Sequence, residues 1–149
     1  METKNLHSDK ETRAFAFEFS KELMKQPKRS RATVIGLIGD LGVGKTTFTQ
    51  AFAKAIGVKK RVLSPTFVIM KRFSLPGNHK FNNLYHIDAY RIEREDLEEL
   101  GIQEMLKGPN LVLIEWADRV KSILPKDTLW LRFKHGDTEN EREVVINRR

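Results

Sequence analysis

A glycine-rich turn between two apolar segments is the feature that most constrains the fold of this chain. The turn lies in GLIGDLGVGKTTFTQAFAKAIG, residues 36–57, after a β-branched run and before an amphipathic pattern. Gly39, Gly44, Lys45 and Thr46 fill the pattern G-x-x-x-x-G-K-[ST]. Where such a turn joins a strand to a helix, its backbone N–H groups curl around phosphate oxygens, and the positive end of the helix adds to the attraction. The sequence therefore predicts a nucleoside triphosphate site.

The predicted phosphate loop spans residues 39–47. Lys45 is expected to reach the β and γ phosphates, and the hydroxyl of Thr46 to bind Mg²⁺. An ordinary strand–turn–helix connection would explain the glycines, but it would not explain a lysine at the positive end of a helix. The residues expected to contact the nucleotide are Gly39, Asp40, Leu41, Gly42, Val43, Gly44, Lys45, Thr46 and Thr47.

Two further apolar segments each end in an acid. LVLIE ends at Glu115, and LYHID ends at Asp88. Hydrolysis needs acids at the carboxyl ends of neighbouring strands, where they hold Mg²⁺ and orient water. Asp88 is the first candidate for the metal beside Thr46, and Glu115 either orients the attacking water or holds the metal through a water. The structural alternative for either acid is a helix N-cap or a surface charge.

Three other residues are weaker candidates. Thr66, in SPTF, lies where many P-loop hydrolases carry a switch threonine, and a proline turn entering a strand is the alternative. His86 alternates with its strand neighbours, which favours a packed or solvent-facing histidine over a proton carrier. Arg91 either stabilises phosphate charge or is an exposed arginine at a helix start.

The rest of the pattern predicts one α/β domain over residues 1–149 with a mixed parallel and antiparallel sheet. Ser8 and Glu11 suggest a capping box at the start of the first helix. The expected elements are a helix over 9–25, a strand over 32–38, a helix ending at Gly57, antiparallel strands over 66–73 and 82–88 joined by a flexible loop, a helix over 94–106 broken at Gly101, a strand over 110–116, a short helix before Pro125, and a hairpin of 128–133 with 142–146.

Composition limits the cellular setting and the partners. The chain has no cysteine, and neither a signal peptide nor a membrane span is evident, so we expect a cytoplasmic protein with no membrane contact. A formal charge of +7 favours polyanionic partners in general terms. The basic clusters at 25–31 and 59–61 are either solvated loops or an RNA-facing surface.

Four motifs together closely resemble the bacterial TsaE family, formerly called YjeE. They are GDLGVGKTT, SPTF, LYHIDAYR and LIEWADR, in this order and after an amphipathic helix, and the resemblance spans nearly the whole chain. It implies a P-loop NTPase fold in which a mixed sheet lies between helices. It also implies slow Mg²⁺-dependent ATP hydrolysis in association with a complex of TsaB and TsaD, where TsaD transfers a threonylcarbamoyl group to position 37 of tRNAs that read codons starting with A.

The resemblance also implies roles for single residues. The family's phosphate loop falls on residues 39–47, its switch-like threonine on Thr66, its metal-linked aspartate on Asp88 and its Walker B acid on Glu115. Trp116 matches the family's Glu-Trp pair, for packing or partner contact. The basic clusters are not family signatures, so contact with tRNA is expected to be indirect or weak.

Base identity and two rival functions are weighed by features that the sequence lacks. No Asn-Lys-x-Asp stretch for guanine occurs, so ATP is the expected nucleotide. A small-molecule kinase would use the same loop, but it usually needs a lid and an acceptor domain, and AYRIEREDLEELG after Asp88 is too acidic to clamp phosphates. A nucleotide-regulated RNA-binding module fits the charge, but the aromatic residues recur at core spacings. The oligomeric state stays open.

Overall fold

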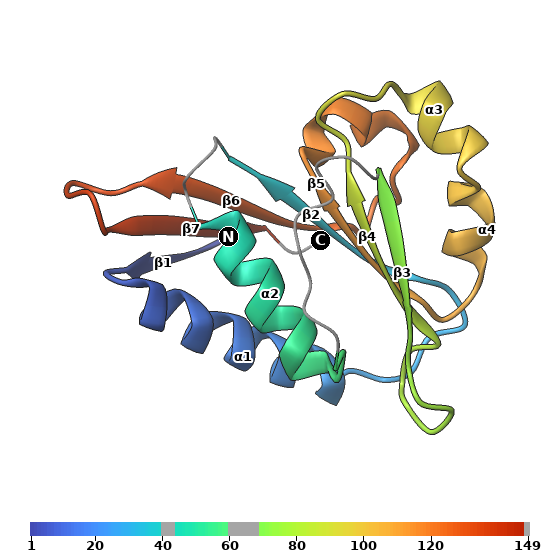
Figure 1. The fold of residues 1–149 in the computed structure, drawn as a ribbon, viewed down its shortest axis with the longest axis horizontal. Coiled ribbons are helices and arrows are strands. Elements are labelled where there is room, and N and C mark those ends of the chain that lie inside the picture. The colour runs from blue at the N-terminus through green and yellow to red at the C-terminus, as the bar shows by residue number, and fades with distance from the viewer. Residues whose placement is uncertain (40–43, 60–68, 148–149) are drawn as a thin grey trace.

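The computed structural model describes residues 1–39, 44–59 and 69–147, and over these ranges the chain forms a seven-stranded sheet with helices on both faces (Figure 1). The strand order is β1-β7-β6-β2-β5-β4-β3. The strands are β1 (Glu2–Leu6), β2 (Thr33–Ile38), β3 (Met70–Ser74), β4 (Asn83–Asp88), β5 (Leu111–Glu115), β6 (Leu129–His135) and β7 (Arg142–Asn147). The helices are α1 (Asp9–Lys25), α2 (Lys45–Ile56), α3 (Arg94–Glu99), α4 (Ile102–Lys107) and the 3-10 helix η1 (Ala117–Ile123).

The centre of the sheet is parallel and its flanks are antiparallel. Strand β2 pairs in parallel with β5 and β6, and β4 pairs in parallel with β5. Strands β3 and β7 run antiparallel to β4 and β6, and β1 runs antiparallel to β7. Strands β2, β4, β5 and β6 therefore begin at one edge of the sheet, here called the amino edge, and end at the other, the carboxyl edge. This arrangement confirms the predicted mixed sheet.

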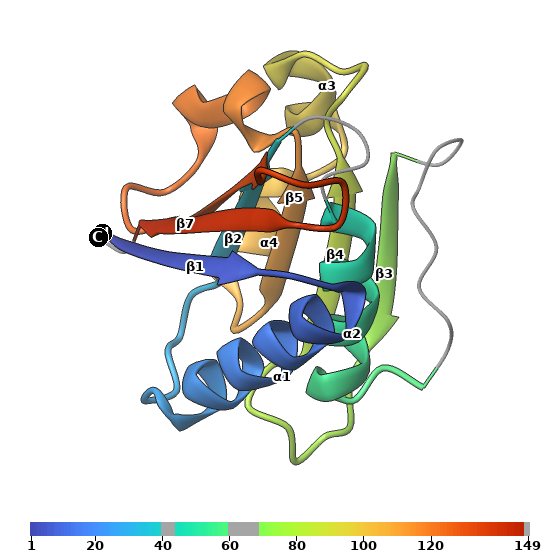
Figure 2. The same cartoon turned by 90° about the vertical axis from the view of Figure 1, so that its left-hand side faces the viewer.

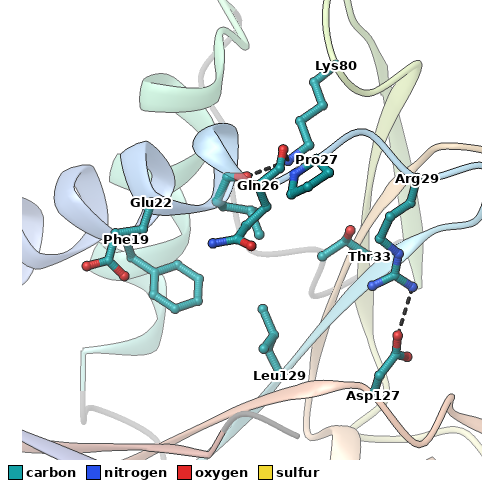
Figure 3. A pocket seen from close by; sticks show the side chains of 10 residues that line it. Phe19, Glu22, Gln26, Pro27, Arg29, Thr33, Lys80, Asp127 and Leu129 are labelled. Atoms are coloured by element: carbon teal, nitrogen blue, oxygen red, sulfur yellow. Dashed lines mark hydrogen bonds and ion pairs between the residues drawn. The ribbon is translucent and has the colours of Figure 1, made fainter.

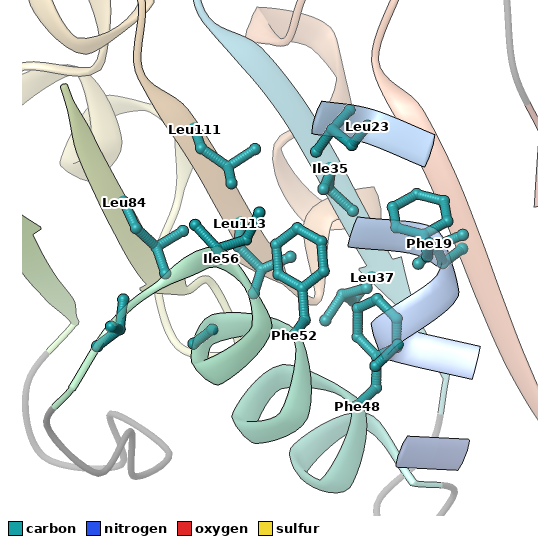
Figure 4. Close-up of a cluster of buried hydrophobic side chains, with 14 of the residues drawn as sticks. Phe19, Leu23, Ile35, Leu37, Phe48, Phe52, Ile56, Leu84, Leu111 and Leu113 are labelled. Carbon is teal, nitrogen blue, oxygen red and sulfur yellow. The ribbon is translucent and has the colours of Figure 1, made fainter. Parts of the chain in front are cut away.

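The fold has three layers, because an apolar core on each face of the sheet holds a layer of helices against it. Helices α1 and α2 lie side by side on one face, and α3, α4 and η1 cover the other (Figure 2). The first core is rich in aromatic rings, and Phe48 and Phe52 of α2 stack with centroids 5.5 Å apart (Figure 4). It includes Phe19, Leu23, Ile35, Leu37, Phe48, Phe52, Leu84, Leu111 and Leu113. The second core includes Val34, Ile87, Leu97, Ile102, Ile114 and Val120.

The first helix begins as predicted, but its capping box is only half formed. The hydroxyl of Ser8 accepts the N–H of Glu11 at 3.1 Å, as an N-cap should. The carboxylate of Glu11 accepts from the N–H and ring of His7, so the reciprocal bond to Ser8 is replaced by bonds to the residue before it. Strand β1, directly before this helix, was not predicted. It is almost wholly exposed and is held by its ladder with β7.

Most other predicted elements are confirmed. The helix expected over 94–106 is broken into α3 and α4 at Gly101, whose φ of 90° ends α3 in the left-handed region. Strand β5 and the β6–β7 hairpin occupy the expected segments. Strand β3 begins at Met70, and the earlier part of its predicted range lies outside the described residues.

The connection between β3 and β4, predicted to be flexible, carries two side chains that bind helix ends at the amino edge. His79 accepts the N–H of Phe81 on Nδ1 at 2.9 Å, so Nε2 bears the proton and donates to the carbonyl of Ile56 at 2.8 Å. The ammonium of Lys80 donates to the carbonyls of Leu23 and Gln26 at 2.5 and 2.6 Å. His79 thus binds a carbonyl at the end of α2, and Lys80 binds two at the end of α1, where the carbonyl of Leu23 also accepts the N–H of Gln26.

A groove of about 440 Å³ lies beside these helix ends, between the end of α1 and the starts of β2 and β6 (Figure 3). Phe19, Leu23 and Leu129 supply apolar walls, and Arg29 forms an ion pair with Asp127 at 2.9 Å. Burial, together with the charge of Arg29, lowers the pKa of Lys80. Because the groove lies at the start of β2 and the glycine turn follows its end, the length of β2 separates the two.

Candidate functional site

The start of α2 lies at the carboxyl edge, directly after the glycine turn. Gly44 takes a φ of 95°, which favours glycine, and the helix begins at Lys45 with no side-chain cap. The first turn carries no acid, and Thr46 on it is exposed. An uncapped helix start attracts anions through its N–H groups and its dipole. The described start of α2 is therefore suited to an anion.

Lys45 is almost fully buried at this helix start. Its exposed fraction is 5%, and its ammonium donates to the carbonyl of Gly39 and lies 4.0 Å from the centroid of the Trp116 ring. A buried ammonium requires electron-rich partners, and a carbonyl and an indole face both supply them. These contacts hold the charge at the mouth of the glycine turn.

The two predicted acids are neighbours at the carboxyl edge. Strands β4 and β5 pair so that Asp88 lies opposite Glu115. Asp88 is half-buried, and its Oδ1 accepts the N–H of Tyr90 at 3.0 Å, which leaves its second oxygen for another ligand. This bond closes the turn after β4 and is not a helix N-cap, since the N-cap of α3 is Glu93. Hydroxyl and carboxylate oxygens are ligands that Mg²⁺ accepts, so Thr46 and Asp88 fit the predicted metal.

Glu115 is buried and bound to a histidine. Its exposed fraction is 6%, that of His86 is 1%, and their Oε2 and Nε2 atoms are 2.7 Å apart. The Nδ1 of His86 is buried without a hydrogen-bond partner among the residues that the structure describes. His86 is packed, which is one of the two positions that the strand alternation left open. Its contact with Glu115 was not predictable from local pattern, because the two residues lie 29 positions apart.

Trp116 follows Glu115 in a strained backbone conformation. Its φ of 58° and ψ of 37° lie in the left-handed region, and no other non-glycine residue in the described ranges has a positive φ. Such a conformation costs about 1–3 kcal/mol and persists where the surroundings enforce it. The conformation places the indole between the ring of Tyr90, 4.8 Å away, and the ammonium of Lys45.

A pocket of about 340 Å³ opens beside Gly39, where β2 and β6 end. Arg132, Lys134 and His135 of β6 line one side of it, and Trp116 and Asp118 line another. Sequence reasoning named Trp116 but missed Arg132, Lys134 and His135. The only available signal was the run of basic residues on a strand that was predicted merely to close the sheet.

A second basic group near the helix start was also missed. A β-carbon added to Gly44 would lie 3.9 Å from Cγ of Arg142 and 4.0 Å from its Nε. Arg142 opens β7 and is far from the glycine turn in sequence. Its guanidinium donates to the carbonyls of Glu139 and Glu141.

The other predicted positions do not contribute to the described site. Residues 40–43 and Thr66 lie outside the described residues. Arg91 is exposed before α3, with its guanidinium 5.9 Å from the Tyr90 ring. Within the described ranges, no three or more His, Cys, Asp or Glu side chains form a metal cluster, and no helix combines the length and apolar character needed to cross a bilayer.

Comparison with known proteins identifies close relatives. The family model described as "Threonylcarbamoyl adenosine biosynthesis protein TsaE" matches residues 6–144. The chain is 44% identical to the tRNA threonylcarbamoyladenosine biosynthesis protein TsaE of Bacillus subtilis over 113 residues, covering 76% of this chain and 68% of that protein. It is 38% identical to the protein of the same name from Rickettsia prowazekii over 145 residues, covering 96% and 92%.

A solved structure agrees with the sequence matches. The crystal structure of Bacillus subtilis YdiB superposes with a TM-score of 0.75 at 30% identity and covers 99% of this chain and 84% of that one. The likeness extends over all three layers described above, so the arrangement of the carboxyl edge is that of a P-loop fold.

Proposed function

Because the chain belongs to the TsaE family of tRNA threonylcarbamoyladenosine biosynthesis proteins, we propose that it binds ATP with Mg²⁺ and hydrolyses it to ADP and phosphate in support of that tRNA modification. One observation carries the proposal: two acids lie side by side on β4 and β5, Asp88 opposite Glu115, at the sheet edge where the uncapped α2 begins with Lys45. Phosphate binding, a metal ligand and a water-orienting carboxylate are thereby available at one edge.

Lys45 and the start of α2 bind the phosphates. The N–H groups of the first turn and the ammonium both point charge of the right sign at phosphate oxygens. A positive residue in a first helical turn is unfavourable by itself, because it faces the positive end of the helix dipole. A phosphate between the Lys45 ammonium and the start of α2 removes this repulsion between two positive charges. This supports a role for Lys45 in binding as well as in turnover.

Thr46 and Asp88 are the proposed holders of Mg²⁺. When bound, the ion neutralises charge on the β and γ phosphate oxygens and so supports departure of the leaving group. The exposed hydroxyl of Thr46 and the second oxygen of Asp88 are the protein ligands we assign to it. Because Oδ1 of Asp88 is fixed by the N–H of Tyr90, the carboxylate enters this role already oriented.

Glu115 is the proposed orienter of the attacking water. Its Oε2 is engaged by His86, so a single oxygen is left for a further partner. One free oxygen suits a hydrogen bond to water better than two-oxygen ligation of a metal. This contact therefore supports water orientation over metal binding as the role of Glu115.

The pocket between the ends of β2 and β6 is the proposed place for the nucleoside. It adjoins Gly39, where the phosphate loop begins, and a volume of about 340 Å³ falls in the range of small-molecule sites. Open α/β sheets bind ligands in the crevice beyond the carboxyl ends of their strands. We propose ATP as the nucleotide, since no guanine-reading Asn-Lys-x-Asp stretch occurs.

The family membership supports a protein partner as well. We propose that the chain hydrolyses ATP slowly alone and works with a TsaB–TsaD complex, with tRNA contacted indirectly or weakly. The hydrolysis supports turnover of that complex, and the transfer to tRNA is performed by TsaD.

Phosphate release from ATP tests the proposal. The purified chain, with and without TsaB–TsaD, is compared with Lys45→Ala as the blank. Slow release that rises with the partners and vanishes in Lys45→Ala is the expected result. Release that is equal in wild type and Lys45→Ala would remove the ATPase, and release that ignores the partners would remove the partnership alone.

A further inference from the structure

We infer that His86 is a positioning residue: its imidazole fixes the carboxylate of Glu115 so that one defined oxygen faces the attacking water. The inference rests on the proposed ATPase function. It adds a residue that acts through Glu115 and touches neither nucleotide nor metal. Its basis is the contact between β4 and β5, and it needs no change of protonation.

The contact is short, buried and geometrically fixed. Nε2 of His86 and Oε2 of Glu115 are 2.7 Å apart, and neither side chain is more than 6% exposed. His86 stands opposite Leu113 in the β4–β5 ladder, so Glu115 is its diagonal neighbour on the same face. Because both side chains are buried, the carboxylate cannot rotate toward solvent. The contact with His86 therefore sets its orientation.

The position of the pair at the strand ends separates it from ordinary core packing. One step further from the carboxyl edge on the same face, the partners are Leu84 on β4 and Leu111 and Leu113 on β5, all fully buried. Apolar side chains therefore fill this face wherever only packing is required. A polar pair replaces them only at the edge that carries Lys45 and Asp88.

The second nitrogen of His86 supports the same conclusion. Its Nδ1 is buried without a partner within the described ranges, whereas His79 at the amino edge uses both of its nitrogens in hydrogen bonds. A histidine kept only for stability would be expected to satisfy both nitrogens, because a buried unpaired polar atom destabilises the fold. His86 is therefore placed for the carboxylate and not for the best local bonding.

Strand β4 thereby carries two linked roles. Asp88, two residues after His86 on the same face, is the proposed metal ligand, and His86 orients the acid on the next strand. The metal-linked oxygen and the water-orienting oxygen are thus set relative to each other by one rigid strand pair. Positioning of this kind commonly changes turnover tenfold to a hundredfold when it is lost.

Three substitutions of His86 test the inference in phosphate release and ATP binding. His86→Phe keeps the ring and removes the donor, and we expect kcat to fall about tenfold to a hundredfold while ATP affinity and the Mg²⁺ titration stay within about twofold. His86→Gln places an amide nitrogen at about the depth of Nε2 and should recover most of the turnover. His86→Asn reaches only the depth of Nδ1 and should not, so it is the matched control for polarity.

The outcomes separate this inference from the function it rests on. Wild-type release no greater than that of Lys45→Ala would overturn the proposed function. Normal wild-type release with an unaffected His86→Phe, equal recovery by Gln and Asn, or ATP affinity that falls in step with kcat would overturn the positioning role alone. Thermal unfolding of each variant identifies any that misfold, and the comparison of Gln with Asn then decides the question without His86→Phe.

Discussion

The two edges of the parallel sheet treat their polar groups in opposite ways. At the amino edge, His79 and Lys80 satisfy carbonyls at the ends of both α1 and α2, and Asp127 is shared by Arg29 and Arg31. At the carboxyl edge, the backbone of Trp116 is strained and one nitrogen of His86 has no partner in the described part of the chain.

This difference indicates that the amino edge stabilises the fold, whereas the carboxyl edge is arranged for function. Helix ends that are bound by side chains resist opening, so the amino edge contributes stability. Strain and incompletely bonded groups persist only where the surrounding structure holds them, and they gather at functional sites. Substitutions at the two edges should therefore change different measured quantities.

The largest expected effect is at the carboxyl edge, on turnover. Glu115→Gln keeps a hydrogen-bonding partner for His86 but weakens the orientation of water, so we expect kcat to fall by at least about 100-fold. The ATP dissociation constant and the melting temperature should stay close to those of the wild type. Phosphate release, calorimetric titration with ATP and thermal unfolding measure the three quantities. A parallel loss of ATP affinity would contradict the division of roles between Glu115 and Lys45.

The next effect is at the amino edge, on stability. His79→Leu combined with Lys80→Met leaves helix-end carbonyls of α1 and α2 without their side-chain donors, at roughly 1 kcal/mol for each helix. We expect the melting temperature to fall by roughly 5 °C while kcat is unchanged. Lys71→Met, an exposed lysine on β3, is the control. A fall in kcat with unchanged melting temperature would break the contrast between the edges.

A smaller effect is expected where Trp116 contacts Lys45. A phosphate and the indole compete for the same ammonium, so Trp116→Leu should tighten ATP binding by about threefold. Calorimetric titration gives the affinity. Trp130→Phe is the control, because Trp130 packs over Gly36 in the middle of β2. Weaker binding in Trp116→Leu would mean that contact of the ring with the nucleoside, in the pocket that Trp116 lines, outweighs its competition for the ammonium.

The smallest effect concerns the exposed pair at the start of α1. The hydrogen bond and charge of Glu11 raise the pKa of His7 above 6.5, and the bond from His7 lowers the pKa of Glu11 below 4.5. The raised His7 pKa gives stability that is lost as pH rises through it, and the lowered Glu11 pKa gives stability that is lost as pH falls through it. The pair therefore stabilises α1 only in the window between.

Ring-proton NMR titration of His7 in the wild type and in Glu11→Gln measures this shift directly. We expect the pKa of His7 to fall in the variant. We also expect the melting temperatures of the two proteins to differ most near pH 5.5 and to converge above about pH 8. A difference that persists at high pH would assign the effect to the helix cap instead of the charge pair.

Patterns carried by single segments were predicted well. The glycine turn, the acid-ended runs and the break at Gly101 each depend on neighbouring residues, and the structure and the family comparison confirm the P-loop fold that they predict. Strand β1 was missed because four of its five side chains are exposed, so no apolar alternation marks it. Its position follows from backbone pairing with β7, which sequence patterns do not encode.

Contacts between distant segments were not predictable from local pattern. The partnership of His86 with Glu115 depends on the register of β4 against β5, and that of His79 with Ile56 depends on where a loop meets a helix end. Arg142 and the basic face of β6 reach the glycine turn only because β6 lies beside β2. The motif residues were therefore identified from sequence, while the residues that surround them were not.

The pairing of β1 with β7 has a consequence for how the chain is made. Residue Glu2 lies opposite Ile146, so β1 finds its partner only after the helices and strands between β1 and β7 have been synthesised. Helix α1 can dock on α2 much earlier, since both lie in the first half of the chain. The nascent chain therefore carries β1 unpaired until β7 has emerged. Four of the five side chains of β1 are exposed, so the unpaired strand has little tendency to aggregate before β7 is synthesised.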